Sequence, residues 1–298
     1  MRNFGRWYKL KLGPFEYEVQ HGFPAYDIKF DINFVRAGVY REGTLSILGL
    51  SLKTISPILA LTTMDKPTAQ ANENNIVKLE AGYLNGPHVT IIEGYVWDAS
   101  VTTPPDMWLN LHLKTMVKTC VAQYPKEFKK REQGWKKGEI ASGLIGLFDA
   151  PGGGKFGFID KTTNKVGDVE TVESFGSGNQ WTEESAILAI NALSANWVCF
   201  INGDNLEAHN RDITKPSPAG DIIVSNETGL LAVSGIDVKN ASVTTFLDDP
   251  ESSLCNLILQ SEKNAAANGK YLILKKRFHG HFEGPEWYTE YTCTNRVA

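Results

Sequence analysis

The strongest constraint on the fold is a strict two-residue alternation near the N-terminus. From Asp27 to Phe34 every even-numbered residue is apolar and every odd-numbered residue is polar. Successive side chains of a β-strand point to opposite faces, so this pattern predicts a strand with one buried and one solvated face. Leu109, Leu111 and Leu113 repeat the alternation. The chain is therefore expected to consist mainly of antiparallel strands.

Other segments rich in β-forming residues surround these two, and turn signals separate them. The segment 84–87, which contains Asn85-Gly86, is typical of a hairpin connection, and Asn268-Gly269 favours another tight reversal. Proline and glycine punctuate 215–220, which is the best linker signal in the chain. The further predicted strands are 44–48, 76–83, 90–97, 197–201, 221–224, 242–247, 254–260, 271–278 and 287–293.

Two helices interrupt the strands. After Ser51, a plausible N-cap, apolar residues recur at helical spacing, but Pro57 inside the segment favours a short or kinked helix. Thr182 can cap the second helix, and the acidic pair 183–184 suits its positive end. The expected apolar faces are Leu52, Ile55, Ile58 and Leu59 in the first helix, and Ala186, Ile187, Ile190 and Leu193 in the second.

Length and composition narrow the class of protein. A chain of 298 residues favours two domains, and 42% hydrophobic residues exclude wholesale disorder. The net charge of −4 argues against a dedicated nucleic-acid binder. The basic segment 126–137 is either a solvated surface or a contact for phosphate or an acidic partner. We predict a mainly β (α+β) fold with a β domain at 1–118, a middle α+β segment at 119–215 and a second β domain at 216–298, which can also take strands from the middle segment.

Cysteines and apolar runs indicate neither a disulfide scaffold nor a membrane span. The four cysteines are far apart, which is typical of buried thiols in a reducing compartment. The start of the chain has no apolar core of a secretory signal. The longest apolar stretch, 45–61, is interrupted by Lys53 and Pro57 and is too short to cross a bilayer. The cysteines are Cys120, Cys199, Cys255 and Cys293.

The glycine-rich segment 152–154 before Lys155 does not meet the requirements of a phosphate-binding loop. Such a loop needs Ser or Thr after the lysine as a magnesium ligand, and Phe156 follows here. We expect a surface loop rather than a nucleotide site.

His279 and His281 are separated by one residue, which places both imidazoles on the same face of a strand, and this arrangement suits zinc. Glu283 and Glu286 lie nearby, but the spacing does not indicate a third and fourth ligand. A surface hairpin ending in Gly284-Pro285 is the favoured interpretation, and a metal site is the alternative.

The sequence contains no specific catalytic motif. There is no Gly-x-Ser-x-Gly, and the cysteines lack an indicated histidine base. Paired glycosidase carboxylates could be brought together only by the fold. We therefore assign no catalytic, cofactor-binding or metal residue and predict a protein that is not an enzyme. The unassigned candidates are the carboxylates Glu93, Asp98, Asp106, Asp248 and Asp249 and the tryptophans 97, 108, 135, 181, 197 and 287, which could stack sugars but are typical of a core or interface.

Two groups of segments resemble the baseplate hub proteins of tailed bacteriophages. At the front, the turn 49–51 precedes strands 77–83 and 91–96, in the order in which such hubs carry an Asn-Leu-Ser-like turn, an Ala-Gly-Tyr strand and a Gly-containing strand; Gly49-Leu50-Ser51 departs from that turn. At the back, the order is also similar, with Asp249-Pro250 where Asn-Pro is usual. The back segments are Glu227–Leu231, Val243–Pro250, Gly269–Lys275, His279–Gly284 and Trp287–Glu290.

The resemblance implies two tail-tube-like antiparallel β-barrels per chain and a structural role in the virion. Such hubs form homotrimers that match a hexameric tail tube or its initiator on one side and a trimeric spike on the other, and they surround passing DNA without reading its sequence. It also implies other baseplate proteins as partners, assembly in the host cytoplasm, no cofactor and no membrane anchor. The alternatives are a tail-tube or distal tail protein and a lytic or carbohydrate-binding tail enzyme.

Overall fold

The computed structural model divides the chain into two compact units. The first contains residues 1–35, 40–116 and 221–298, and the second contains 36–39 and 117–220. The predicted loop at 152–154 and nearly all of the basic segment 126–137 lie outside the described residues. The described residues are 5–35, 41–63, 76–102, 106–115, 135–136, 157–161, 171–172, 183–192, 197–202, 205–210, 221–237, 239–247 and 256–297.

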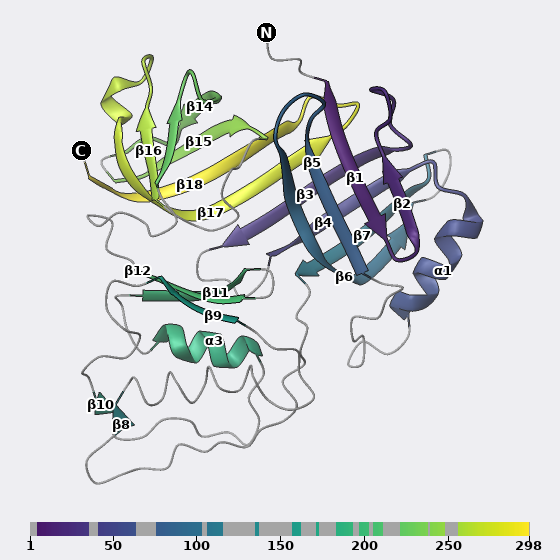
Figure 1. Cartoon of the computed structure of the whole chain (residues 1–298), viewed down its shortest axis with the longest axis horizontal. Helices are drawn as coiled ribbons and strands as arrows, with labels where there is room; N and C mark the ends of the chain where they lie inside the picture. Colours follow the sequence, from purple (N-terminus) through teal and green to yellow (C-terminus); the bar gives the residue numbers. More distant parts are fainter. Residues whose placement is uncertain are drawn as a thin grey trace. The chain divides into compact units, whose positions relative to one another are not determined.

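The first unit contains one 13-stranded sheet, and its front strands curl around a core (Figure 1). The mainly β class predicted from the sequence is confirmed. The front strands are β1 (Arg6–Leu12), β2 (Phe15–Glu18), β3 (Asp27–Val35), β4 (Arg41–Leu48), β5 (Ile76–Tyr83), β6 (His88–Val101) and β7 (Trp108–Thr115). The back strands are β13 (Ile222–Ser225), β14 (Leu230–Ser234), β15 (Ala241–Phe246), β16 (Asn256–Gln260), β17 (Gly269–His281) and β18 (Trp287–Val297).

The sheet contains the same five-strand arrangement twice. The front strands lie in the order β3-β4-β7-β6-β5, and the back strands lie in the order β14-β15-β18-β17-β16, so both sets occupy matching places along the chain. All neighbours within each set are antiparallel. The sixth strands differ, because β1 pairs antiparallel with β5 whereas β13 pairs parallel with β16.

Matching β-bulges align the two sets residue by residue. The register between β6 and β7 shifts at Trp97, and the register between β17 and β18 shifts at Leu274. Both bulged side chains are solvent-exposed, at 38% and 39%. A bulge inserts one unpaired residue and bends its strand, and here it occurs at the same place in both sets. Trp97 and Leu274 are therefore equivalent positions.

The core of the front set forms from the alternation seen in the sequence. The even-numbered residues of β3 are buried, and their neighbours are partly exposed. Ile28, Phe30 and Ile32 pack with the inward residues of β1, β4, β5, β6 and β7. Leu247, Phe278 and Trp287 from the back of the chain belong to the same core. Burial of this apolar face stabilises the curved front part of the sheet.

Helix α1 (Leu52–Thr63) forms where the sequence predicts a helix and continues past Pro57. It has 12 residues, although Pro57 lies inside it and cannot donate a hydrogen bond to the Lys53 carbonyl. Lys53 and Pro57 are both exposed, so water can hydrate that carbonyl. Ile55 and Ile58 are buried as predicted, whereas Leu52 is 66% exposed and lies outside the apolar face.

The second unit contains two small sheets and a helix. Helix α3 (Glu183–Ala192) begins beside the predicted cap and buries Ile187 and Ile190. One sheet joins β9 (Gly157–Lys161), β12 (Asn205–Asn210) and β11 (Trp197–Asn202), and the other joins β8 (Trp135–Lys136) and β10 (Thr171–Val172). Among the described residues, no helix is long and apolar enough to cross a bilayer.

Candidate functional site

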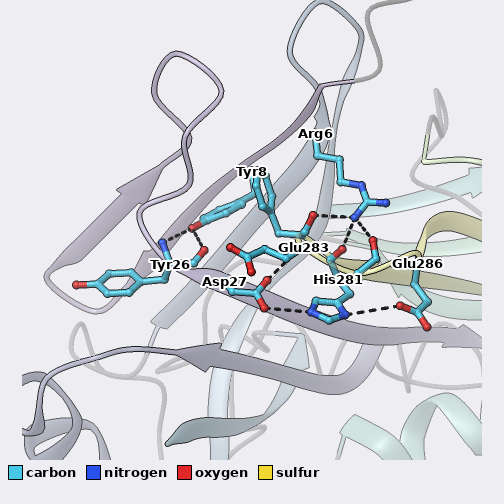
Figure 2. Close-up of polar contacts among 9 residues, drawn as sticks. Arg6, Tyr8, Tyr26, Asp27, His281, Glu283 and Glu286 are labelled. Atoms are coloured by element: carbon cyan, nitrogen blue, oxygen red, sulfur yellow. Dashed lines mark hydrogen bonds and ion pairs between the residues drawn. The ribbon is translucent and has the colours of Figure 1, made fainter. Parts of the chain in front are cut away.

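A cluster of polar side chains joins the start of β1 to the turn between β17 and β18 (Figure 2). Arg6 leads this cluster. Its guanidinium donates hydrogen bonds to the carbonyl oxygens of His281, Phe282 and Gly284, with 2.7 Å between Nη1 and the Phe282 oxygen. We call Arg6, Tyr8, Tyr26, Asp27, His281, Glu283 and Glu286 the closure cluster, because together they connect β1, β3 and the turn between β17 and β18.

His281 lies between two carboxylates of the closure cluster. Its Nε2 is 3.0 Å from Oδ2 of Asp27, and its Nδ1 is 3.7 Å from Oε2 of Glu286. The other oxygen of Asp27 accepts a hydrogen bond from the backbone N–H of Glu283 at 3.2 Å. Asp27 therefore ties the first residue of β3 to the end of β17 and to the turn that follows it.

Tyr8 closes the curl at the opposite side of the cluster. Its hydroxyl donates to the Tyr26 carbonyl at 2.6 Å and accepts from the Tyr26 N–H at 3.0 Å. The ring is fully buried, and this desolvation raises the pKa of Tyr8 to about 12. The hydroxyl stays protonated at any physiological pH and keeps both hydrogen bonds.

The guanidinium of Arg6 also contacts the aromatic ring of Trp287. Its guanidinium carbon lies 5.5 Å from the ring centre of Trp287, and the Trp287 Nε1–H donates to the Gly82 carbonyl at 2.9 Å. Burial lowers the pKa of Arg6 from its ordinary value, but the group starts so high that it remains charged. A fixed cation with its fork directed at backbone carbonyls is suited to holding a turn in place.

The closure cluster has the chemistry of a clamp. Catalysis by a hydroxyl or thiol that histidine activates needs that group within hydrogen-bond reach of the ring. Both ring nitrogens of His281 instead face carboxylate oxygens, and the surrounding bonds end on backbone groups. The arrangement connects β1, β3 and the β17–β18 turn.

The predicted histidine pair lies on one face of β17, but the two rings have separate partners. His279 Nε2 is 3.8 Å from Oε2 of Glu290, whereas His281 contacts Asp27 and Glu286. Burial lowers the pKa of His279, and the nearby Arg277 adds to that effect. Within the described ranges, no group of three or more His, Cys, Asp or Glu side chains is placed to hold a metal ion.

The other sequence candidates are dispersed. Glu93 and Asp106 are exposed, and Asp98 is half-buried and bonds the N–H of Ala99. Cys199 and Cys293 are free and buried, as predicted, and burial raises the pKa of the Cys293 thiol. Lys155, Asp248, Asp249, Cys120 and Cys255 lie outside the described residues.

Arg6 and Tyr8 were missed by the sequence reasoning, and one signal could have found them. Tyr8, Leu10 and Leu12 alternate with Lys9 and Lys11, which is the pattern of a half-buried strand, and this is β1. The role of Arg6 itself had no local signal, because the carbonyls that it contacts are about 275 residues away in sequence.

Beside the closure cluster, Asp31 and Arg277 pair across β3 and β17. Arg277 Nε lies 2.8 Å from Oδ1 of Asp31, and this hydrogen bond lowers the pKa of the carboxyl below its ordinary 3.8. A lowered pKa adds stability that is complete above 3.8 and is lost as pH falls through the folded-state value. We expect Asp31→Asn to reduce the acid sensitivity of the fold by less than about 1 kcal/mol, because both side chains are over one-third exposed.

Urea titrations at pH 6 and at successive values below 4 measure this effect. The wild type and the Asp31→Asn variant should differ most at pH 6 and converge as Asp31 of the wild type becomes protonated. A constant difference across the whole range would contradict the assignment.

Comparison with known proteins places the fold. No protein-family model matches the sequence, and no curated protein matches it. A tail protein from Neisseria meningitidis matches with a TM-score of 0.58 and 10% identity, covering 98% of this chain and 97% of that one. A 43 kDa tail protein from a prophage of Shewanella oneidensis gives 0.55 and 11%, covering 97% of each chain. The fold is that of phage tail proteins.

A secretion component has the same fold. A component of the type VI secretion system of Escherichia coli, itself described as similar to tail proteins of bacteriophage T4, matches with a TM-score of 0.58 and 9% identity. The match covers 97% of this chain and 77% of that one. The resemblance seen in the sequence is thus confirmed for the fold.

Proposed function

We propose that this chain is the hub of a phage-type tail baseplate, a homotrimer that adapts a hexameric tail tube to a trimeric spike. The observation that carries the proposal is the repeated strand arrangement, β3-β4-β7-β6-β5 and β14-β15-β18-β17-β16. Three copies present six such sets, which matches a six-membered ring on one side and a three-membered partner on the other. Tail proteins with the same fold support this role.

The repeated strand arrangement also supports a division of the chain into two barrels and a middle segment. We assign the first tube-like barrel to residues 1–118 and the second to 216–298, with the middle α+β segment 119–215 between them. Superposition of the two five-strand sets on the equivalence of Trp97 and Leu274 is the direct check of this division.

The proposed partners are the tail tube or its initiator, the central spike and other baseplate proteins. The ring would surround the path of the genomic DNA and contact it without reading its sequence. The near balance of 30 basic and 34 acidic residues suits a channel wall that does not retain DNA. We place the protein in the virion tail after assembly in the host cytoplasm, with a structural rather than an enzymatic role.

Native mass spectrometry of the purified chain tests the proposal. We expect a trimer of about 99 kDa, which is three times the 33.0 kDa of one chain. Added tube protein should give a complex with six tube subunits for each trimer, and added spike should give three. A chain that remains monomeric, or that polymerises into tubes, would contradict the hub.

A further inference from the structure

The junction between the front and back sets carries titratable side chains on its outward face. It forms where residues 29–35 of β3 pair antiparallel with residues 275–281 of β17. Phe278 and its partner Ile32 point inward and are buried in the front core. The alternate residues of both strands point outward, and several of them are charged or can take up a proton. The stability of this junction can therefore depend on pH.

His279 lies in the middle of this outward face. It is directly opposite Asp31 on β3 and opposite Tyr288 on β18. Its ring is tilted against the ring of Tyr288, with 4.9 Å between the two ring centres, and its side chain is 15% exposed. A histidine that is enclosed between neighbouring strands loses most of its hydration, and this loss disfavours the charged form of the imidazole.

The carboxylate opposite His279 is already paired with another side chain. Asp31 accepts two hydrogen bonds from Arg277, at 2.8 Å between Nε and Oδ1 and at 2.5 Å between Nη2 and Oδ2. Arg277 precedes His279 by two residues on β17, so both side chains lie on the same face of the sheet. A proton on His279 would therefore place a second cation beside Arg277, whose own partner is fixed.

The remaining charged groups around His279 do not reverse this balance. Oε2 of Glu290 is 3.8 Å from Nε2 of His279, which is longer than a hydrogen bond. Asp31, Glu290 and Glu286 favour the charged imidazole, but burial and Arg277 have the larger effect and lower the pKa of His279 from its ordinary 6.5. The titratable and charged groups that face His279 are Asp31 from β3, Arg277 and His281 from β17, and Tyr288, Glu286 and Glu290 from β18 and the turn before it.

We infer that the β3–β17 junction is acid-sensitive and that His279 is the group that makes it so. When His279 takes up a proton, the new charge lies in a largely dehydrated position beside Arg277, and the pairing between the front and back sets weakens. This property belongs to the single chain and does not depend on the proposed hub.

The direction of the effect follows from the lowered pKa of His279. The unfolded chain binds a proton on this histidine near pH 6.5, whereas the folded chain binds it only at lower pH. Between those two values unfolding takes up one proton, so the equilibrium constant of unfolding rises by up to about tenfold for each pH unit of acidification. The stability that neutral His279 provides is therefore fully present above the ordinary pKa of histidine and is lost as pH falls toward the folded-state value.

Urea titrations of the full-length chain between pH 8 and pH 5 test the inference. His279→Gln keeps a polar side chain but cannot take up the proton, so its unfolding constant should rise less steeply with acid than that of the wild type, by up to about tenfold per pH unit. His112→Gln, at an exposed position on β7, is the matched control and should follow the wild type. Parallel pH profiles for the wild type and His279→Gln would overturn the inference.

Two further measurements locate the effect in the molecule. Amide hydrogen exchange at pH 7.5 and pH 5.5, corrected for the intrinsic exchange rate, should show a loss of protection in 29–35 and 275–281 of the wild type and a smaller loss in His279→Gln. An even loss over the whole sheet would contradict the junction as the acid-sensitive part. The imidazole of His279 in the wild type, followed by NMR, should titrate with a midpoint below 6.5. A midpoint at or above that value would overturn the inference even if His279→Gln fails to fold.

Discussion

Trp287→Ala is expected to lower the free energy of unfolding of the first unit by about 3–5 kcal/mol. Trp287 is 4% exposed, and its ring packs against Phe30 and Phe282 at centroid distances of 5.4 and 6.0 Å. The substitution leaves a cavity between the front core and β18, and it removes the hydrogen bond to the Gly82 carbonyl. Urea unfolding followed by far-UV circular dichroism measures the loss.

Two variants separate packing from hydrogen bonding at this site. Trp287→Phe keeps most of the apolar contact but loses the hydrogen bond to the Gly82 carbonyl, so it should cost about 0.5–1.5 kcal/mol. Leu52→Ala, at a side chain that is 66% exposed, should change stability by less than about 0.5 kcal/mol. Equal losses for Trp287→Ala and Leu52→Ala would show that Trp287 does not support the core.

Arg6→Ala is expected to destabilise the first unit by about 2–4 kcal/mol, because charge-assisted hydrogen bonds to three carbonyls disappear together. The loss should be local at first. Amide hydrogen exchange should accelerate in the turn between β17 and β18 and at the start of β1, before the rest of the sheet is affected.

Controls for this prediction are available on the same strand and at the same position. Lys9→Ala removes a surface ion pair with Glu16. The Lys9 side chain is 37% exposed and the Glu16 side chain is 55% exposed, so the substitution should cost less than about 1 kcal/mol. Arg6→Lys keeps the charge but loses the planar fork, so it should recover only part of the stability. If Arg6→Ala and Lys9→Ala are equally mild, the closure cluster does not act as a clamp.

Local patterns in the sequence predicted most strands, because alternation is a local consequence of one buried face. Asp27–Val35 and Ile76–Tyr83 form where the pattern places them. β2 and β14 were not predicted, since each is short and half-exposed at the end of the strand order. The full length of α1 was not predicted, because Pro57 removes one hydrogen bond inside the helix.

Long-range pairing could not be derived from the sequence. The resemblance implied two barrels, but no local signal indicated that β17 is long enough to serve both sets or that β3 pairs with its second half. The closure cluster could not be predicted for the same reason, because Asp27 and His281 come together only after β3 pairs with β17. Side chains that act across such a junction show no periodicity of their own.

The pairing of β3 with β17 also has a consequence for biosynthesis. A ribosome releases β3 early, yet the strand that covers its edge is made only when residues 275–281 emerge. The edge of β3 therefore stays unpaired during most of translation. A chain that ends before Gly269 lacks β17 and cannot cover this edge. Prematurely terminated copies would lack both the covered edge and the β17–β18 turn that Arg6 holds, and so would be poor building blocks for a multi-copy assembly.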